Sequence, residues 1–522
     1  MKYNNLLLQI VTSALPMAAL PTLCQAKRQP ATVLHQRPNI ILFMVDDMGW
    51  EDSSVPFWTS RIPRNDLLET PNMEKLARQG MLFTQAYATP ISSPTRCSLL
   101  TGSNAARHRV TNWSLERNVM TDAEDDKMAV PHWNVNGISP VNTTENAYYA
   151  RSFVQILRDS GYHTIHCGKA HWGAIDTPGE NPTAWGFNVN IAGHAGGAPA
   201  TYLSERNYGH RQDGTSTSAF AVPGLRQYWG TGTFLTEALT KEALAALDKA
   251  KKYQQPFFLY MAHYAIHIPI DRDQRYFSKY VRKGFSDKEA AYASLIEGMD
   301  KSLGDIMDWL NKNDEAKNTI LIFMSDNGGY ATGMSWRDAP LYTQNAPLKC
   351  GKGSLYEGGI REPMIVRWPG TVKPGTRCDK YLIIEDFYPS LLEMAEIKKY
   401  DTPQTIDGIS FIPLLKGSKD TSRDRALYWN YPNVWGNEGP GISLNCAIRW
   451  NEWKLIYSYK TGKKELYNIH DDIGEADDVS SNHQALTNKL SRLLGSYLRK
   501  VQAQRPIVKA TGQPAPWPDD RK

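Results

Sequence analysis

Residues 39–50 of the chain read Asn-Ile-Ile-Leu-Phe-Met-Val-Asp-Asp-Met-Gly-Trp. The first seven form an apolar run with the length of a fully buried strand, and the run stops abruptly at Asp46 and Asp47. A second segment repeats this design, because the strand predicted at 319–324 ends in Ser325-Asp326-Asn327-Gly328. Strands that are apolar throughout are typical of parallel sheets covered on both faces, and ligands gather beyond the carboxyl ends of such strands.

Helical patterns alternate with strands along the first four-fifths of the chain. We therefore expect an α/β fold, with a large mixed, mostly parallel sheet sandwiched by helices. A long stretch at 174–233 is rich in Gly, Pro, Asn and His and is predicted to be loop. The expected helices are 71–79, 147–159, 237–251 and one that begins at the capping box of Ser286; the other expected strands are 81–87, 162–167 and 256–262.

The pattern changes after about residue 415. Short aromatic strands at 426–431, 446–450, 453–459 and 464–468 predict a small antiparallel sheet, and 486–501 is an amphipathic helix that would pack on it. The Pro-rich tail from Arg505 is expected to be loosely ordered. We divide the chain into a catalytic domain at 37–415 and a C-terminal subdomain at 416–522.

The composition argues against some classes of function and favours others. The 522 residues include 59 Lys and Arg against 54 Asp and Glu, spread along the chain, which is not the profile of a nucleic-acid-binding protein. The 15 Trp and 26 Tyr suit a cleft that stacks on sugar rings. Five cysteines beyond residue 26 are odd in number and unpaired in spacing, so we predict no disulfide framework: Cys97, Cys167, Cys350, Cys378 and Cys446.

The N-terminus has the pattern of an export signal. Lys2 precedes an apolar stretch at 6–20, and Cys24-Gln25-Ala26 fits a small-x-small cleavage site before Lys27. We expect residues 1–26 to be a signal peptide and the mature protein to be periplasmic. Lipid attachment at Cys24 is the alternative, although Pro21-Thr22-Leu23 matches such a site poorly. No other apolar stretch is long enough to span a bilayer.

Residues 92–102 read Ser-Ser-Pro-Thr-Arg-Cys-Ser-Leu-Leu-Thr-Gly. Ser92 is a small nucleophile, and Arg96 follows within about one helical turn, where its guanidinium could hold an anion at a helix N-terminus. Alone, the pattern also fits a turn that leads into a helix. The run resembles the signature of the type I, formylglycine-dependent sulfatases of the alkaline phosphatase superfamily. That resemblance implies that Ser92 is oxidised to formylglycine (3-oxoalanine), whose hydrate has two geminal hydroxyls.

The acidic pairs could hold a metal ion. Brought together, the three carboxylates and one amide oxygen of Asp46, Asp47, Asp326 and Asn327 make a hard oxygen site of the kind that Ca²⁺ prefers. Either pair alone would more often be a helix cap or a solvated turn. The sulfatase resemblance implies one Ca²⁺ on these four residues plus the oxygen of formylglycine 92.

Three further segments resemble sulfatase motifs. Gly168-Lys169-Ala170-His171 implies a sulfate-binding Lys169 and a His171 that contacts the formylglycine hydroxyl. The segment 263–269 implies His267 as the group at the leaving oxygen, with His263 further away. Residues 347–363 closely resemble a stretch of arylsulfatase A. There Lys352 is the expected second sulfate ligand rather than Lys349, and Glu357 and Arg361 would brace the loop.

These observations predict an exported sulfatase that hydrolyses O-sulfate esters of carbohydrates, with galactose or N-acetylgalactosamine sulfate as the preferred sugars. Serine at position 92 implies maturation by a radical-type sulfatase-maturating enzyme. The catalytic set is Ser92, Arg96, Lys169, His171, His267 and Lys352. Loop residues proposed as sugar contacts are His194, Arg206, His210, Trp336, Arg337, Asp338 and Trp435.

Two alternatives stay open at this point. One is a phosphate or phosphonate monoester hydrolase of the same superfamily, which would need a His-rich second metal site that the sequence does not display. The other is a non-catalytic glycan-binding protein on the same scaffold, against which the complete set of catalytic residues argues. Activity on an aryl sulfate would separate both from a sulfatase.

Overall fold

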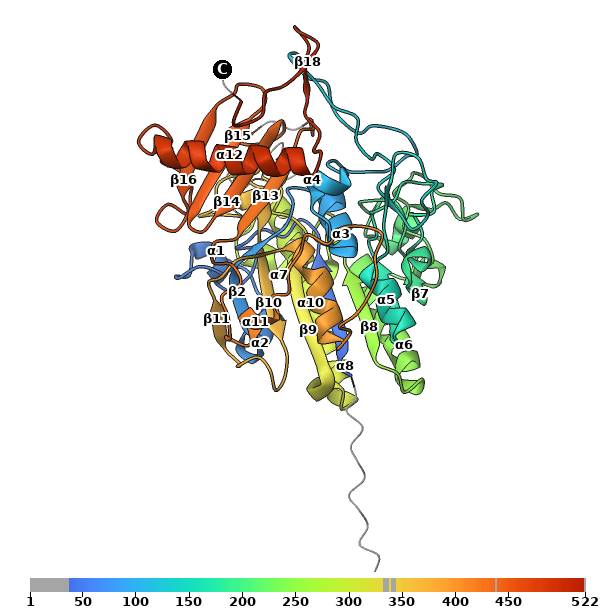
Figure 1. Ribbon diagram of the computed structural model, residues 1–522. Helices are drawn as coiled ribbons and strands as arrows, with labels where there is room; N and C mark the ends of the chain where they lie inside the picture. The colour runs from blue at the N-terminus through green and yellow to red at the C-terminus, as the bar shows by residue number, and fades with distance from the viewer. Residues whose placement is uncertain (1–36, 332–337, 339–343, 437–438, 521–522) are drawn as a thin grey trace, which may run out of the picture. The chain divides into compact units, whose positions relative to one another are not determined.

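The computed structural model describes residues 37–331, 338, 344–436 and 439–520 (Figure 1). A nine-stranded sheet has the order β11-β2-β10-β9-β1-β8-β6-β7, with β12 beside β2. This confirms the predicted α/β class. The strands are β1 (Asn39–Val45), β2 (Met81–Tyr87), β6 (His163–Gly168), β7 (Val189–Ile191), β8 (Phe257–Ala262), β9 (Thr319–Ser325), β10 (Arg361–Arg367), β11 (Thr376–Cys378) and β12 (Leu382–Ile383).

The centre of the sheet is parallel. β1 pairs in parallel with β8 and β9, and β6 pairs in parallel with β8, whereas β10 runs antiparallel to β9 and β2. The register places Val45 opposite Ser325, so the acidic pairs that follow these two residues meet at one edge. The carboxyl ends of β9, β1, β8 and β6 therefore form the continuous polar edge that the sequence predicted.

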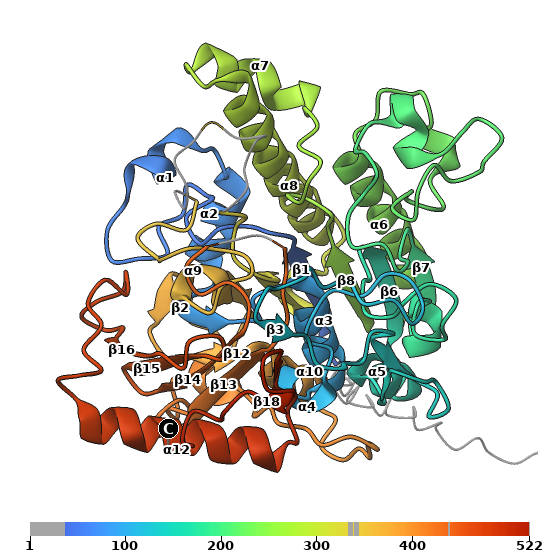
Figure 2. The ribbon, with the colours of Figure 1, turned by 90° about the horizontal axis from the view of Figure 1, so that it is seen from above.

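Alternate residues of β1 enter two separate hydrophobic cores, one on each face of the sheet. Ile40, Leu42 and Met44 belong to one core, and Ile41, Phe43 and Val45 to the other. Helices cover both faces, so a strand that is apolar throughout is buried on both sides (Figure 2). The covering helices include α3 (Ser92–Thr101), α5 (Phe153–Asp159) and α10 (Phe387–Met394) for the first core, and α2 (Pro71–Gln79), α6 (Leu235–Lys252), α7 (Gln274–Arg282) and α8 (Asp287–Lys312) for the second.

One predicted helix starts late. The pattern at 147–159 predicted a helix from residue 147, but α5 begins at Phe153, because Ser152 caps it and accepts a hydrogen bond from the Gln155 backbone N–H. The residues before the cap form the short strand β5 (Tyr148–Tyr149), which pairs with β4 (Ile138–Ser139). The apolar spacing that suggested helix therefore continues through a strand.

The C-terminal part forms the predicted four-stranded antiparallel sheet, with strands β13 (Ala426–Tyr431), β14 (Asn445–Trp450), β15 (Trp453–Ser458) and β16 (Lys464–Asn468). Helix α12 (Gln484–Lys500) packs on it (Figure 1). The expectation of a loosely ordered tail is wrong for residues 505–520. β17 (Ile507–Val508) pairs with β3 (Met128–Ala129), and the Arg505 guanidinium lies 4.2 Å from the centre of the Trp517 ring.

Among the described residues, no helix combines the length and apolarity needed to cross a membrane. The five cysteines beyond residue 26 are buried and free, as predicted. The expected signal peptide, residues 1–26, lies outside the described residues.

Candidate active site

Polar side chains that follow three parallel strands converge at the carboxyl edge of the sheet. Asp46 and Asp47 follow β1, Asp326 and Asn327 follow β9, and Lys169 follows β6. All five side chains are buried. Ser92, the first residue of α3, reaches the same point after β2, so the two acidic pairs and the serine run that stood out in the sequence occupy one site.

Ser92 lies at the centre of this cluster. Its Oγ is 3.1 Å from Asp46 Oδ1 and 3.1 Å from Asn327 Oδ1, and Lys169 Nζ donates to it at 3.0 Å. The same ammonium group is 2.6 Å from Asp46 Oδ2. A buried hydroxyl that is surrounded by carboxylate, amide and ammonium groups is held in one position, as a nucleophile must be.

Arg96 joins the helix of Ser92 to the end of β9. Its Nη2 and Nε lie 2.8 and 3.0 Å from Asp326 Oδ2, and its Nη1 donates to the Lys169 carbonyl oxygen at 3.1 Å. Tyr260 also contacts this guanidinium, at 3.3 Å, a partner that the sequence gave no reason to expect. The fork geometry of arginine suits this bracing of two strand ends and one helix.

Asp47 contacts Lys352, Asn327 and His267. Lys352 Nζ lies 2.6 Å from its Oδ1, Asn327 Nδ2 donates to that oxygen at 2.8 Å, and His267 Nε2 is 3.5 Å from its Oδ2. His267 Nδ1 lies 2.8 Å from the carbonyl oxygen of Ile268. A carbonyl only accepts, so the neutral ring carries its proton on Nδ1 and turns an unprotonated Nε2 toward Asp47.

Packing so many charges in a buried site shifts their pKa values. Burial and the neighbouring Asp326 carboxylate raise the pKa of Asp46 to about 8. Burial alone would also raise the pKa of Asp47, but the Lys352 ammonium group, joined at low pH by the charge of His267, outweighs it and holds that pKa well below its usual value. Burial and Lys352 lower the pKa of His267 to about 3, so its imidazole is neutral at neutral pH.

The donor set fits a hard divalent cation. Ligand atoms of Asp46, Asp47 and His267 all lie within 4.8 Å of one another. Asp326 Oδ1 accepts from the Asp47 backbone N–H, and Asn327 Oδ1 lies 3.1 Å from Ser92 Oγ. Burial is the main cause of the raised pKa of Asp46, the Asp326 carboxylate adds to it, and a bound cation would favour the ionised form of this carboxyl group. Oxygen-rich carboxylate sites of this kind match Ca²⁺ better than zinc. Within the described part of the chain, this is the one group of His, Cys, Asp and Glu with such spacing.

The other two histidines differ in position. His171 lines the same cavity as Ser92, but its Nε2 is bonded to Ser93 Oγ at 3.0 Å and lies 3.1 Å from the Ser114 carbonyl oxygen. No direct hydrogen bond joins it to Ser92 among these contacts. His263 is fully buried, with its Nε2 2.8 Å from Ser302 Oγ, which agrees with its expected place away from the reacting group.

A cavity of about 660 Å³ opens above the cluster. Ser92, His171, His267 and Lys352 line its polar end, and Trp435 is the one proposed sugar contact found in its wall. Asp338 is ion-paired with Lys288 at 3.2 Å, and His210 stacks on Trp229. Trp336 and Arg337 lie outside the described residues, and the other proposed sugar contacts, Asp338, His194, Arg206 and His210, are not in the wall. Three further cavity residues were not predicted from the sequence: Trp113, Phe220 and Tyr330. They lie in segments that show no helical or strand periodicity.

A second buried charge cluster braces the loop of Lys352, as the sequence suggested for Glu357 and Arg361. Glu357 binds Arg361 at 3.2 Å and the fully buried Lys454 of β15 at 2.9 Å. Lys454 also lies 2.9 Å from Glu475, whose other oxygen accepts the Glu357 backbone N–H at 2.6 Å. The C-terminal sheet therefore fixes the loop through charges that have no access to water.

Replacing Lys454 by methionine is expected to lower the free energy of unfolding by about 3–5 kcal/mol, because Glu357 and Glu475 would stay buried without their shared counter-charge. Denaturant unfolding of the full chain measures this. Lys460→Met is the control, since Lys460 forms a partly exposed pair with Asp125 and Asp126 and should cost less than about 1 kcal/mol. Equal losses in the two variants would refute the bracing role.

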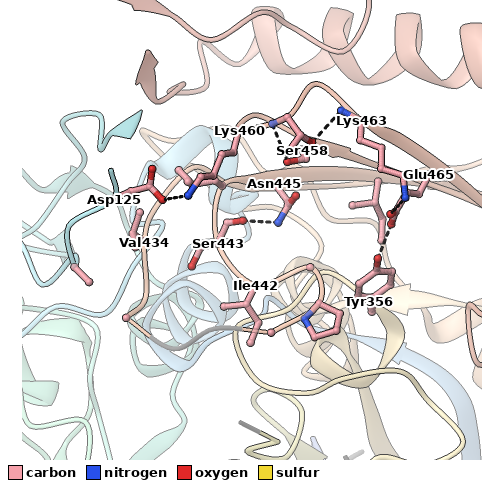
Figure 3. Close-up of a pocket in the computed structure, with 18 of the residues that line it drawn as sticks. Asp125, Tyr356, Val434, Ile442, Ser443, Asn445, Ser458, Lys460, Lys463 and Glu465 are labelled. Atoms are coloured by element: carbon pink, nitrogen blue, oxygen red, sulfur yellow. Dashed lines mark hydrogen bonds and ion pairs between the residues drawn. The ribbon is translucent and has the colours of Figure 1, made fainter. Parts of the chain in front are cut away.

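A further cavity, of about 570 Å³, is lined by residues of β14, β15 and β16 and of neighbouring loops (Figure 3). Val434 and Gly436 line this second cavity, whereas Trp435 between them lines the first. Its two lysines are already paired, Lys460 with Asp125 at 2.6 Å and Lys463 with Glu465 at 2.6 Å, and none of the predicted catalytic residues lines it. The first cavity, above Ser92, is therefore the candidate active site.

Comparison with known proteins agrees with this geometry. Residues 38–397 match the family described as Sulfatase, and residues 350–504 match the C-terminal family of N-sulphoglucosamine sulphohydrolase. The chain is 30% identical to a sulfatase of Formosa agariphila, over 94% of each protein, and 29% identical to the N-acetylgalactosamine-6-sulfatase of Mus musculus, over 76% of this chain and 70% of that protein.

Solved structures show the same fold. The crystal structure of Ps i-CgsB has a TM-score of 0.70 and 27% sequence identity, and covers 89% of this chain and 93% of that one. The same protein in complex with k-i-k-neocarrahexaose gives a TM-score of 0.69, with the same identity and coverage.

Proposed function

The chain belongs to the sulfatase family and hydrolyses sulfate esters, and from this premise we propose that its substrates are sulfated carbohydrates and that oxidised Ser92 is the nucleophile. The observation that supports the assignment best is the position of Ser92 Oγ, within 3.1 Å of Asp46, Asn327 and Lys169 at the floor of a cavity. The relatives named as an N-acetylgalactosamine-6-sulfatase and as a complex with a hexaose favour sugar substrates, with galactose or N-acetylgalactosamine sulfate preferred.

We propose that a radical-type maturating enzyme converts Ser92 to formylglycine, whose hydrate supplies one hydroxyl to attack sulfur and a second to release the product. Asp46, Asp47, Asp326 and Asn327 would hold one Ca²⁺, which when bound offsets the negative charge of the sulfate group. Lys169 keeps the nucleophile in place, and Lys352 lies where a sulfate oxygen would need a cation. Arg96 fixes Asp326 and the start of α3.

The two cavity histidines would move protons. His267 is proposed to protonate the leaving alcohol after its Nε2 has taken up a proton on substrate binding. Burial and the Lys352 charge lower the pKa of this imidazole in the free protein, and the arriving sulfate anion would offset the Lys352 charge. His171 is proposed to take the proton of the remaining hydroxyl as sulfate leaves. Its present partners, Ser93 and the Ser114 carbonyl, hold its ring within the cavity wall until then.

The proposal is tested on protein that is co-produced with a radical maturating enzyme. Mass spectrometry of the peptide that contains Ser92 should show a loss of two hydrogens, and the same protein should release sulfate from an aryl sulfate and from a monosulfated sugar. An aryl phosphate serves as the comparator, because preferential phosphate release would support the esterase alternative. Active protein with an unmodified Ser92 would refute the formylglycine mechanism.

We also propose that the protein is exported to the periplasm, because residues 1–26 have the pattern of an export signal. N-terminal sequencing of protein from a periplasmic fraction should begin at Lys27. A lipidated N-terminus at Cys24, recovered with membranes, would instead establish the anchored alternative.

A further inference from the structure

The cavity above Ser92 has two chemically different parts. Its polar end holds Ser92, His171, His267 and Lys352, all of which the proposed reaction uses. The wall beyond that end is aromatic and aliphatic, with Trp113, Phe220, Tyr330 and Trp435 as its largest side chains. A substrate whose sulfate reaches Lys352 must therefore place the rest of its first ring against this wall.

Trp435 is held rigidly beside the sulfate end. Its ring packs on Gly353, where a Cβ would lie only 2.4 Å from Trp435 Cε3, and its centroid is 5.8 Å from Lys352 Nζ. The Tyr330 ring meets it edge-on at a centroid distance of 5.5 Å. Its backbone N–H donates to Ser443 Oγ at 3.0 Å. An aromatic ring that is fixed in this way can stack on a sugar without first being ordered.

The segment around Trp435 is itself anchored. Ser354, next to Gly353, donates from its Oγ to the Pro440 carbonyl oxygen at 2.7 Å and forms an isolated bridge with Ile442. Trp435 and Lys352 thus belong to two stretches that are joined through Ser354, Pro440 and Ile442. Their spacing is set before any substrate arrives.

Charge is distributed unevenly along the cavity. Among the described residues that line it there is no Asp, Glu or Arg, and Lys352, already paired with Asp47, is the single lysine. Beyond the polar end, the described side chains of the wall offer only uncharged groups for hydrogen bonding, such as the hydroxyls of Thr217 and Ser218. A second anionic group on the same ring would be desolvated there without a counter-charge, which is costly.

We propose that Trp435 is a specificity-determining residue of this enzyme, a platform on which the ring that carries the scissile sulfate stacks, and that this ring is a neutral sugar with no second charge. The acceptable class is thus a monosulfated hexose or N-acetylhexosamine, and the rejected class is a disulfated ring or a sulfated uronic acid. The inference rests on the proposed function, because it needs the sulfate to lie between Ser92 and Lys352.

The test uses the mature, formylglycine-containing protein, with galactose 6-sulfate and N-acetylgalactosamine 6-sulfate against N-acetylgalactosamine 4,6-disulfate. The wild type should cleave the better monosulfate with a kcat/KM at least about tenfold above that of the disulfate. Trp435→Ala should raise KM for that monosulfate about tenfold and change kcat less, because stacking binds the ring without contacting the reacting atoms. Trp435→Phe should keep most of the affinity.

Two controls separate a lost platform from a disturbed site. Inhibition by inorganic sulfate reports on the polar end of the cavity and not on its aromatic wall, so its inhibition constant should stay within about twofold in Trp435→Ala. Trp453→Ala makes the same truncation on β15, where Trp453 contacts His483 outside the cavity, and should leave both constants unchanged. Parallel losses of sulfate inhibition and sugar affinity in Trp435→Ala would overturn the platform, and equal cleavage of the disulfate would overturn the charge rule.

The failure of the inference and of the proposed function have different signatures. Fully modified wild-type protein that releases no sulfate from any sugar or aryl sulfate would overturn both. Protein that releases sulfate normally, but shows no effect of Trp435→Ala on any sugar, would overturn the inference and leave the sulfatase function intact.

Discussion

Ser92→Ala is expected to reduce sulfate release by about four orders of magnitude or more, the scale seen when the nucleophile of a covalent mechanism is removed. The loss should be in kcat, because the ammonium groups of Lys169 and Lys352 remain near position 92 and can still bind sulfate. Steady-state release from an aryl sulfate measures the effect. The variant should also give an unmodified peptide at position 92 in mass spectrometry.

Ser98→Ala is the matched control for this loss. Ser98 lies on the same helix, but its Oγ contacts His108 at 3.0 Å and does not reach the cavity. The Ser98→Ala variant should keep kcat within a few-fold. It would leave the buried His108 imidazole without its Ser98 partner, which should lower the free energy of unfolding by about 1–3 kcal/mol. Turnover that persists in Ser92→Ala at more than a tenth of the wild-type rate would show that another group attacks sulfur.

The polar edge of the sheet could be predicted because it depends on short-range patterns. Each apolar run of strand length ends in its own polar pair, and parallel pairing then brings Asp46 beside Asp326 without further information. Ser92 could be placed because it begins a helix directly after β2. In both cases the local sequence determines the helix or strand, and the topology of a parallel sheet brings the residues that follow its strands to one edge.

The cavity wall could not be predicted in the same way. Trp113, Phe220 and Tyr330 come from irregular segments whose paths depend on tertiary contacts, so nothing in their neighbourhood distinguishes them from ordinary loop residues. Lys454 is a second case. A lysine in a short strand normally faces solvent, and its complete burial follows from two carboxylates, Glu357 and Glu475, that come from distant parts of the chain.

Asp46→Asn is expected to lower kcat/KM by about a thousandfold, the upper range for losing one preorganised electrostatic group. Asn keeps one oxygen near Ser92 Oγ but removes the charge that binds Lys169 at 2.6 Å and that would hold the cation. The loss of the metal should be detectable directly, without measuring catalysis. Elemental analysis of dialysed protein should give about one Ca²⁺ per wild-type chain and much less in the variant.

Thermal unfolding gives a readout of the site that needs no turnover. At a Ca²⁺ concentration one hundred times the dissociation constant, the cation should stabilise wild-type protein by about 2.7 kcal/mol, and a chelator should remove this gain. Asp46→Asn should show little of it. Asp52→Asn is the control, because Asp52 is equally buried six residues later but binds Arg64 and Tyr292 instead of the cluster. It should lose stability and still respond to Ca²⁺, whereas an undiminished Ca²⁺ response in Asp46→Asn would place the metal elsewhere in the chain.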